Sequence, residues 1–209
     1  MLDSKCKICR RSGTKLFLKG DKCFSAKCAL TRRPYGPGMK TKKRKKAPSE
    51  YGKELGEKQK VKGWYNLRER QFKKYVKEIL EKRGKVENTS SLLVQKLEMR
   101  LDNTVFRLGF ASSRSAAKQM VTHGHLYING KLTDVPSRQM KKGDKISIKP
   151  FSKDKAIFKN LAATLKKYQV PSWLELDKDK LEGKVIGLPT PEETALPAEI
   201  SAIFEYYSR

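Results

Sequence analysis

The chain has 209 residues, of which 48 are lysine or arginine and 22 are aspartate or glutamate, giving a formal net charge of +26. With 37% hydrophobic residues it can bury a core, so it is not a wholly disordered tail. Such a charge repels itself in a compact protein and favours a polyanionic partner, whose condensed counterions are released on binding. No apolar run approaches the ~18 residues that span a bilayer, which argues against a membrane partner.

The basic charge is concentrated towards the N-terminus. Residues 1–46 hold sixteen lysines and arginines but only Asp3 and Asp21 as acidic residues, a net charge of +14. The last twenty residues hold four glutamates against Arg209, a net charge of −3. This asymmetry predicts a basic N-terminal arm on a body that folds by burial, with nucleic acid as the favoured partner. Met1–Cys6 contains no apolar stretch, so we expect no secretory signal and a cytoplasmic location.

All four cysteines lie in the first 28 residues. Two residues separate Cys6 from Cys9, thirteen separate Cys9 from Cys23, and four separate Cys23 from Cys28. Two close pairs joined by a loop are typical of a chain that places four thiolates around one Zn²⁺ ion. Four protein ligands leave no position for water, so we expect the ion to be structural. Four free buried thiols or a redox pair are the alternatives.

The segment after the last cysteine is basic and is interrupted by proline and glycine. Residues 31–48 contain eight basic residues and no acidic one. Such a segment cannot bury a core, which predicts an extended arm that orders in crevices of folded RNA. A solvated linker is the alternative. The arm residues expected to contact RNA are Arg32, Arg33, Lys42, Lys43, Arg44, Lys45 and Lys46.

Apolar residues recur at spacings of three and four between residues 50 and 98, which predicts helices. The residues expected to face a core are Leu67, Phe72, Tyr75, Val76, Ile79 and Leu80. Arg68, Arg70 and Lys73 lie between them, and we expect these three to contact RNA. The alternative is a helix face that is only solvated.

The apolar and turn pattern of residues 99–150 predicts two short helices followed by a small antiparallel sheet. The first helix is marked by an apolar stripe of Leu97, Leu101, Val105 and Leu108 that ends at Gly109, and Ser112 or Ser113 begins the second. Alternating apolar residues on either side of Asn129-Gly130 predict a hairpin. The residues of this module expected to contact RNA are Arg100, Arg107, Arg114, Lys118 and His125.

These assignments differ in strength from residue to residue. Arg107, Arg114 and Lys118 are the favoured contacts, and the fork of an arginine guanidinium group can bind a phosphate through two hydrogen bonds. Asp102 and Asn103 are expected to hydrogen-bond the backbone instead. His125 can either stack on an RNA base or satisfy a buried group.

The same module resembles a known domain. The resemblance is carried by Arg100-Leu101-Asp102-Asn103, Arg107-Leu108-Gly109-Phe110-Ala111, Ser113-Arg114, His123-Gly124-His125, Ile128-Asn129-Gly130, Pro136-Ser137 and Lys142-Gly143-Asp144. It is similar to the RNA-binding domain of the family of bacterial small-subunit ribosomal protein four. Pseudouridine synthases, tyrosyl-tRNA synthetases and small RNA-binding stress proteins also carry this domain, so the module alone implies structured RNA rather than the ribosome.

Segments outside the module resemble the full-length ribosomal family. They are Glu57-Lys58-Gln59-Lys60-Val61, Glu69-Arg70-Gln71-Phe72, Pro171-Ser172-Trp173-Leu174-Glu175 and Ile203-Phe204-Glu205-Tyr206-Tyr207-Ser208-Arg209. The four cysteines resemble the zinc-bearing N-terminus of one subset of bacterial members. Where the family often has Gln-His-Gly after its Arg-Pro, this chain has Gly36-Pro37-Gly38-Met39. The RNA contacts of the arm are therefore expected to differ in detail.

The resemblance implies a function and a set of partners. Family members bind small-subunit ribosomal RNA early in assembly, at a five-helix junction in the body of the subunit, and influence the accuracy of decoding. They contact small-subunit protein five and line the path by which messenger RNA enters, and in some bacteria they repress their own messenger. A non-ribosomal RNA-binding regulator or stress factor that uses the same module is the alternative.

The expected fold class is α+β: an N-terminal zinc loop and an all-helical domain, with an inserted RNA-binding domain of two short helices on a small antiparallel sheet. The expected domains are residues 1–46, the zinc loop and basic arm; residues 47–97 with 190–209, the helical domain; and residues 98–189, the RNA-binding domain. The insertion follows from apolar residues at 200–204, which are expected to pack back on the helical domain.

The C-terminal third adds structure rather than chemistry. Apolar residues at helical spacing between Ile157 and Tyr168 predict a core-facing helix, and a strand is expected around Val185-Ile186. The sequence has no Gly-rich phosphate loop and no nucleophile with a plausible base. Residues 150–209 are too few to form the catalytic domain of a pseudouridine synthase. We therefore do not expect an enzyme.

Overall fold

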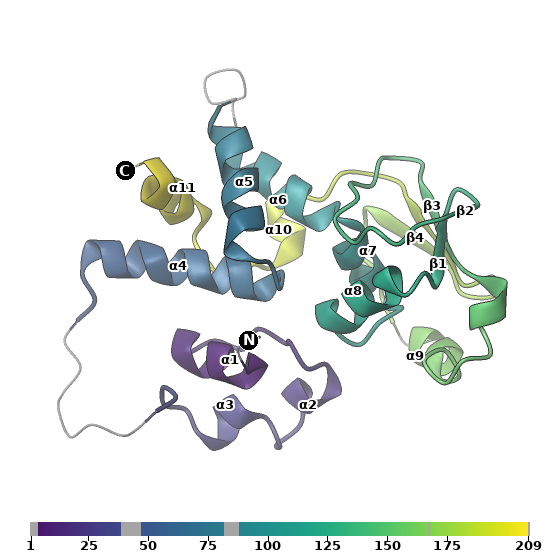
Figure 1. Ribbon diagram of the computed structural model, residues 1–209, viewed down its shortest axis with the longest axis horizontal. Helices are drawn as coiled ribbons and strands as arrows, with labels where there is room; N and C mark the ends of the chain where they lie inside the picture. The colour runs from purple at the N-terminus through teal and green to yellow at the C-terminus, as the bar shows by residue number, and fades with distance from the viewer. Residues whose placement is uncertain (1–3, 39–46, 82–87, 167, 209) are drawn as a thin grey trace. The chain divides into compact units, whose positions relative to one another are not determined.

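The computed structural model describes residues 4–38, 47–81, 88–166 and 168–208. The chain divides into two compact units, coloured along the sequence in Figure 1. The first unit comprises Met1–Leu93 with Ala195–Arg209, and the second comprises Val94–Thr194. Helices combined with an antiparallel sheet confirm the expected α+β class. The domain boundaries expected at residues 46, 97 and 189 stay predictions.

The described part of the first unit is helical. Its helices are α1 (Lys5–Ser12), α2 (Asp21–Phe24), α3 (Ala29–Arg32), α4 (Glu50–Trp64), α5 (Glu69–Leu80), α6 (Thr89–Glu98), which runs on into the second unit, and α11 (Ile200–Ser208). Helix α4 begins where the Ser49 hydroxyl accepts a hydrogen bond of 3.2 Å from the backbone N–H of Gly52. Within the described residues, no helix is long and apolar enough to cross a membrane.

Helices α4 and α5 both pack against α11. Phe72, Val76 and Ile79 lie on one face of α5 and are buried, as their spacing predicted. Helix α11 packs against α4 and α5 and buries Ile203 and Phe204, so residues far apart in the sequence lie side by side (Figure 1). The expectation that residues 200–204 pack back on the helices is confirmed.

The N-terminal loop, which comprises the cysteine-bearing helices α1 to α3 and their connections, packs against the C-terminal end of α4. Cys9, Leu16 and Leu18 form a small buried cluster, against which Trp64 packs. A Cβ atom at Gly63 would lie 2.8 Å from Cδ1 of Leu16, closer than two carbon atoms can approach. Glycine at this position therefore allows the loop to lie directly on α4.

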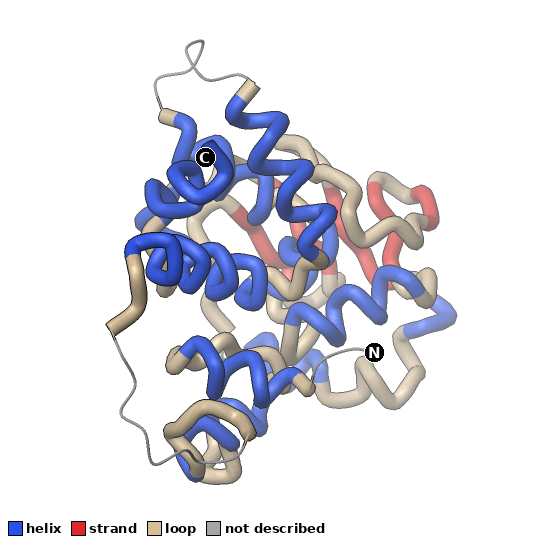
Figure 2. The backbone as a smooth tube through the Cα atoms, turned by 60° about the vertical axis from the view of Figure 1, so that its left-hand side comes forward, coloured by secondary structure: helices blue, strands red, loops and turns tan. Residues whose placement is uncertain are grey.

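The second unit combines short helices with one sheet. Its elements are α7 (Leu101–Arg107), α8 (Arg114–Thr122), β1 (Leu126–Ile128), β2 (Lys131–Leu132), β3 (Lys145–Ile148), the 3₁₀ turn η1 (Pro150–Ser152), α9 (Leu161–Lys166), β4 (Leu174–Asp177), β5 (Glu182–Val185) and α10 (Pro191–Thr194). The five strands, red in Figure 2, pair antiparallel in the order β2-β1-β3-β5-β4. Apolar side chains from α7, α8, α9 and the sheet form a single core.

Several turns and helix ends of this unit lie where the sequence predicted them. Asn129 and Gly130 have φ angles of 50° and 78°, as a tight hairpin turn between β1 and β2 requires. Gly109, with φ of 79°, follows the last turn of α7. The Ser113 hydroxyl accepts a hydrogen bond of 3.3 Å from the backbone N–H of Ala116, so Ser113 is the residue that caps α8.

The apolar stripe expected to continue from residue 97 to residue 108 is interrupted. Helix α6 ends at Glu98, and Arg100 adopts an extended conformation with φ of −70° and ψ of 139°. Arg100 forms an isolated antiparallel bridge with Gln139. The backbone N–H of Met140 donates to the carbonyl of Met99 at 2.7 Å. The backbone between α6 and α7 therefore pairs with residues 139–140 instead of continuing as a helix.

Helix α7 lies directly on the sheet. A Cβ atom at Gly183 of β5 would overlap the side chain of Leu108, so glycine is required for this close approach. Leu101, Val105 and Leu108 of the expected stripe are all fully buried.

The C-terminal part of the second unit departs from the prediction. The helix expected from Ile157 to Tyr168 begins only at Leu161, after a series of turns. Those turns bury Phe158 and leave Ile157 59% exposed, so Ile157 does not face the core. Strand β5 occupies the position expected near Val185, whereas strand β4 was not predicted.

Candidate RNA interface and metal site

The four cysteines line one pocket in the N-terminal loop. Cys9, Cys23 and Cys28 are buried and Cys6 is partly exposed. Cys9 comes from α1, Cys23 from α2, and Cys28 caps α3, so three short helices bring the sulfur atoms towards the same space. The four cysteines, which form two close pairs in the sequence, thus lie around the same pocket.

Backbone N–H groups surround these sulfur atoms. The N–H of Lys19 donates to the Sγ atom of Cys23 at 3.4 Å. The pKa of Cys28 is lowered, chiefly because the backbone N–H of Thr31 at the start of α3 hydrogen-bonds its sulfur. The pKa of Cys9 is raised, first by burial and then by its three cysteine neighbours. N–H donors of this kind orient thiolate ligands in metal sites.

The structure does not by itself identify a metal site. Within residues 4–38 and the other described ranges, no group of three or more His, Cys, Asp or Glu side chains is found that could hold a metal ion. The four thiols are nonetheless the donor set that Zn²⁺ prefers for a structural site. The pocket therefore fits zinc in its chemistry, while zinc binding itself stays a prediction.

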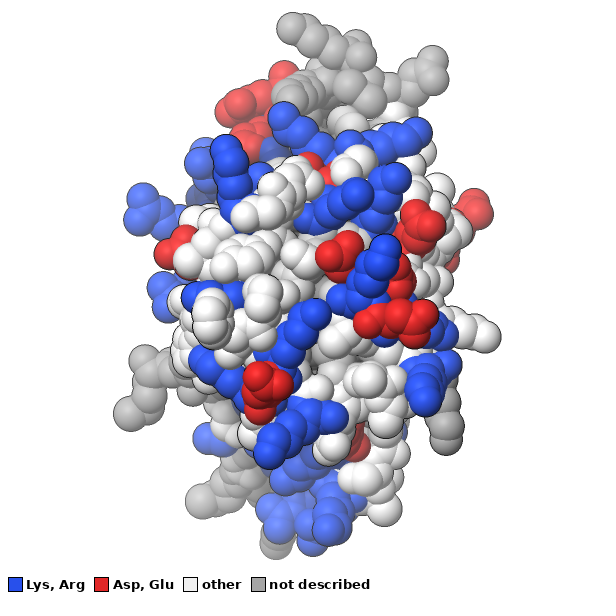
Figure 3. Space-filling view, turned by 90° about the vertical axis from the view of Figure 1, so that its right-hand side faces the viewer, with Lys and Arg blue, Asp and Glu red and all other residues white. Residues whose placement is uncertain are grey.

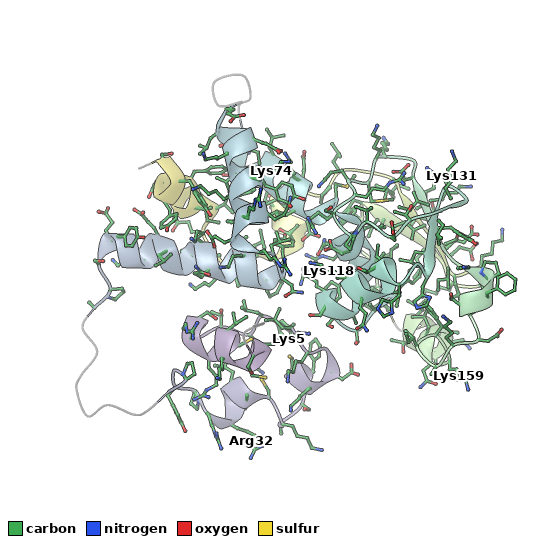
Figure 4. All side chains as sticks on the ribbon, viewed as in Figure 1. Lys5, Arg32, Lys74, Lys118, Lys131 and Lys159 are labelled. Carbon is green, nitrogen blue, oxygen red and sulfur yellow. The ribbon has the colours of Figure 1, made fainter. Side chains whose placement is uncertain are left out.

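Arg10 of α1 holds the start of the basic arm. Its guanidinium group donates hydrogen bonds to the backbone carbonyls of Arg33 at 3.2 Å, Tyr35 at 3.0 Å and Gly36 at 3.2 Å. The same group lies 5.0 Å from the ring centroid of Tyr35, within the range of a cation–π interaction. The exposed side chains of Arg32 and Arg33 are thus presented by a segment with a fixed backbone (Figure 4). Sequence patterns did not indicate this role of Arg10.

The outer face of α5 is a second basic surface. Arg68 and Arg70 at its N-terminal end and Lys73 in its middle are all exposed. Lys74, which follows Lys73, is also exposed and is labelled in Figure 4. The buried residues of α5 occupy its opposite face, so the cations follow from the amphipathic pattern. The remaining predicted arm residues, 42–46, lie outside the described residues.

A buried polar network surrounds the N-terminal end of α7. Glu98, whose side chain is fully buried, accepts two hydrogen bonds from Arg107, at 2.9 and 2.8 Å, and one from Asn103 at 2.6 Å. Asn103 in turn accepts a hydrogen bond of 2.7 Å from Arg114. Asn103 also donates to the backbone carbonyl of Glu98, and Asp102 accepts from a backbone N–H, as was expected of both residues.

Three arginines expected to contact phosphates belong to this network. Arg100 is 2% exposed and donates to both carboxylate oxygens of Asp102, at 3.0 and 2.7 Å. Arg114 is 5% exposed, with its guanidinium group 4.6 Å from the ring centroid of Phe106. Arg100 therefore does not lie on the polar side of α7, because it precedes the helix and points into the protein. Contact of these arginines with RNA stays a prediction and would require them to leave their present partners.

Comparisons with known proteins agree over nearly the whole chain. Residues 1–98 match the family described as the ribosomal protein S4/S9 N-terminal domain, and residues 99–146 match the S4 domain. Proteins named small ribosomal subunit protein uS4 are 48% identical in Caldicellulosiruptor bescii, 47% in Thermoanaerobacter sp. (strain X514) and 43% in Thermus thermophilus. Each alignment covers 98% of this chain and 96% of the relative.

The chain belongs to the S4 family of ribosomal proteins. The boundary between the two family matches coincides with the end of α6, immediately before the extended Arg100. The S4 domain thus begins at the buried polar network and continues through the hairpin to β3.

In the S4 domain, His125 and Lys118 differ in their accessibility. His125 is 6% exposed, its Nδ1 atom lies 3.0 Å from the Ser152 hydroxyl, and its ring meets Phe158 edge to face. Burial lowers the pKa of His125, and the positive charge of Lys155 adds to the effect. Stacking of this buried ring on an RNA base stays a prediction. Lys118, on the partly exposed side of α8, is accessible to a phosphate (Figure 4).

Proposed function

We propose that this S4-family chain is a structural constituent of the small ribosomal subunit and binds the ribosomal RNA of that subunit. The observation that carries the proposal is the 48% to 43% identity, over 98% of the chain, to proteins named for the small subunit. The net charge of +26 supports the same conclusion, because a compact protein of this charge needs a polyanionic partner. Its place of action is the cytoplasmic ribosome.

The RNA-binding surface consists of the accessible cations of each unit. Arg32 and Arg33 on the arm, Arg68, Arg70 and Lys73 on α5, and Lys118 on α8 are positioned to contact phosphates. The fork of an arginine can bind two oxygens of one phosphate, and lysine adds a mobile point charge. These contacts position the protein on the RNA, and the shape of the folded RNA supplies the specificity.

Binding of this kind makes the chain an early participant in subunit assembly. A protein with two folded units and a basic arm can hold several RNA segments together and so stabilise their junction in the body of the subunit. The resemblance to the family supports contact with neighbouring ribosomal proteins, especially small-subunit protein five. It also supports a contribution to translational accuracy and proximity to messenger RNA.

One structural Zn²⁺ ion held by Cys6, Cys9, Cys23 and Cys28 completes the N-terminal loop. The described loop buries few large apolar side chains, chiefly Leu16 and Leu18, and therefore gains little stability from burial alone. When bound, zinc supplies folding free energy to a segment of this kind. The four cysteines hold the ion, and the N–H donors around them orient the sulfur atoms.

Sedimentation of small ribosomal subunits through a sucrose gradient in high salt tests the proposal against its alternative. A structural constituent remains bound in amounts equal to the other proteins of the subunit. A regulator or stress factor that uses the S4 domain washes off, because its contacts are fewer and mainly electrostatic. Loss of the chain from washed subunits would contradict the proposed function.

A further inference from the structure

Phe151 of the 3₁₀ turn η1 is 86% exposed, more than any other large hydrophobic side chain among the described residues. Phe24, the next most exposed ring at 75%, stacks on Phe17 with centroids 4.9 Å apart. For Phe151, no ring contact is found within the part of the chain that the structure describes. Single exposed hydrophobic side chains are common on protein surfaces, so the surroundings of Phe151 decide whether it marks a binding site.

The turn that carries Phe151 is held firmly on the S4 domain. The backbone N–H of Ser152 donates to the carbonyl of Lys149 at 2.8 Å, and Pro150 fixes the first backbone angle of the turn. The Ser152 side chain is 2% exposed and hydrogen-bonds His125. Successive side chains of a 3₁₀ turn are about 120° apart, so Phe151 does not share the inward direction of Ser152. The exposure of the ring therefore follows from the backbone of the turn.

The residues around the exposed ring are basic. Between residues 149 and 159 the chain carries four lysines, Lys149, Lys153, Lys155 and Lys159, against Asp154 alone. Lys153, Lys155 and Lys159 are exposed, and Lys149 is partly exposed. Figure 4 shows Lys159 projecting from the turns that precede α9. The side of the molecule drawn in Figure 3 carries many lysine and arginine side chains, with fewer acidic side chains among them. An aromatic ring among cations is the arrangement by which proteins bind unpaired nucleotides.

We propose that Phe151 is a stacking platform for an unpaired RNA base, with the lysines of the 149–159 segment bound to the adjoining phosphates. This inference rests on the proposed RNA-binding function and extends it to a site that contacts a base. The phosphate contacts of the arm and of α5 favour any RNA backbone, whereas a stacked base must be unpaired and accessible. The ligand is therefore a bulged, looped or junction nucleotide of the ribosomal RNA.

Charge decides between RNA and a protein partner for this surface. A protein that covered Phe151 through an apolar contact would also have to desolvate at least three exposed lysines, which is costly unless it is strongly acidic. In RNA, a base can stack on the ring while phosphates of the same nucleotide segment bind the lysines. A single ligand therefore accounts for both features.

The test is the affinity of the full chain for naked small-subunit ribosomal RNA, measured for the wild type and for three substitutions of Phe151. Phe151→Ala is expected to lower the affinity about 5- to 100-fold, the usual effect of removing one base–aromatic stack. The slope of log affinity against log salt concentration should not change, because no charge is removed. Phe151→Trp should retain the affinity, and Phe151→Leu should lose most of it, since leucine is apolar but cannot stack.

Ile157→Ala is the matched control, because Ile157 is exposed in the same segment but carries no ring; its affinity should equal that of the wild type. Chemical probing of the bound RNA should show that Phe151→Ala exposes an unpaired nucleotide and leaves the other protected positions unchanged.

Equal affinities for the wild type and Phe151→Ala would overturn the proposal and leave the proposed function intact. A Phe151→Leu variant that binds like the wild type would also overturn it in favour of an apolar contact. If the wild type itself did not bind, both proposals would fail.

Discussion

Arg107 and Glu98 form a two-point ion pair inside the second unit, with N–O distances of 2.9 and 2.8 Å. The guanidinium fork that makes arginine a good ligand for phosphate here binds a carboxylate from the end of the preceding helix. Arg107 also donates to the backbone carbonyl of Thr194 at 3.2 Å, so the pair connects α7 to the end of α10. In this position Arg107 stabilises the fold.

Replacing Glu98 by glutamine should destabilise the second unit strongly. The substitution removes the negative charge that balances Arg107, and breaking a buried ion pair on one side costs about 3 kcal/mol or more. Urea unfolding followed by the fluorescence of Trp173, in a chain whose other tryptophan, Trp64, is replaced by phenylalanine, measures this cost. Glu175→Gln, at an exposed position on β4, is the control and should change stability by less than about 0.5 kcal/mol.

Arg10 should act on RNA binding through the arm that it holds. Arg10→Lys keeps the charge but loses the fork that binds three carbonyls, so the segment carrying Arg33 is no longer fixed. We expect the RNA affinity of Arg10→Lys to fall to a level near that of Arg33→Ala. The double variant should bind RNA no more weakly than either single variant. The two effects on the binding free energy would then differ from additivity by about 1 kcal/mol. Arg11→Lys, one residue further along α1, is the control; additive effects of the two substitutions would contradict this role.

The first unit should lose stability in acid because of Glu69. Burial alone would raise the pKa of this carboxyl, but hydrogen bonds from Lys58, Lys62 and Tyr207 outweigh burial and lower the pKa to about 2. A carboxyl with a depressed pKa in the folded state contributes stability above its unfolded pKa, near 4.5. That contribution is lost as the pH falls from about 4.5 towards 2.

Thermal unfolding between pH 6 and pH 2 tests this contribution of Glu69. Glu69→Gln should be less stable than the wild type at pH 6, and the difference should shrink progressively as the pH approaches 2. Glu205→Gln, an exposed position on α11 of the same unit, should follow the wild type. A constant difference between Glu69→Gln and the wild type across this range would show that the charge of Glu69 is not responsible.

Cys23→Ser should release zinc from the purified protein and unfold the N-terminal loop. The 99–150 module should remain folded, because its core is formed without the loop. Elemental analysis measures the metal, and proteolysis of the loop reports its unfolding. Ser25→Ala, an exposed residue of the same loop, is the control and should retain one zinc ion. Full retention of zinc by Cys23→Ser would contradict the assignment of the four cysteines.

Local patterns predicted the parts of the fold that depend on neighbouring residues. The spacing of Phe72, Val76 and Ile79 indicated the buried face of α5, and Asn129-Gly130 indicated the hairpin, because both signals lie within a few residues. The four cysteines line one pocket, and their binding of zinc stays a prediction.

Features that depend on distant partners were not predictable from the sequence. The positive charge of Arg114 suggested exposure, but the side chain is buried and donates a hydrogen bond to Asn103, which precedes it by a helix and a turn. Helix α6 ends because Gln139 pairs with Arg100, a pairing between residues far apart in the sequence. The helical spacing that begins at Ile157 was misleading, since turns bury Phe158 instead.

The salt dependence of binding to naked small-subunit ribosomal RNA tests the central claim most directly, namely that accessible cations of this chain bind the phosphates of folded RNA. The affinity of the full chain should fall steeply and linearly on a plot of log affinity against log salt concentration. Deleting residues 1–46 should make the slope shallower by about 0.7–0.9 for each phosphate that the arm neutralises in the full chain. A full chain that showed no binding to this RNA at physiological ionic strength would contradict the account.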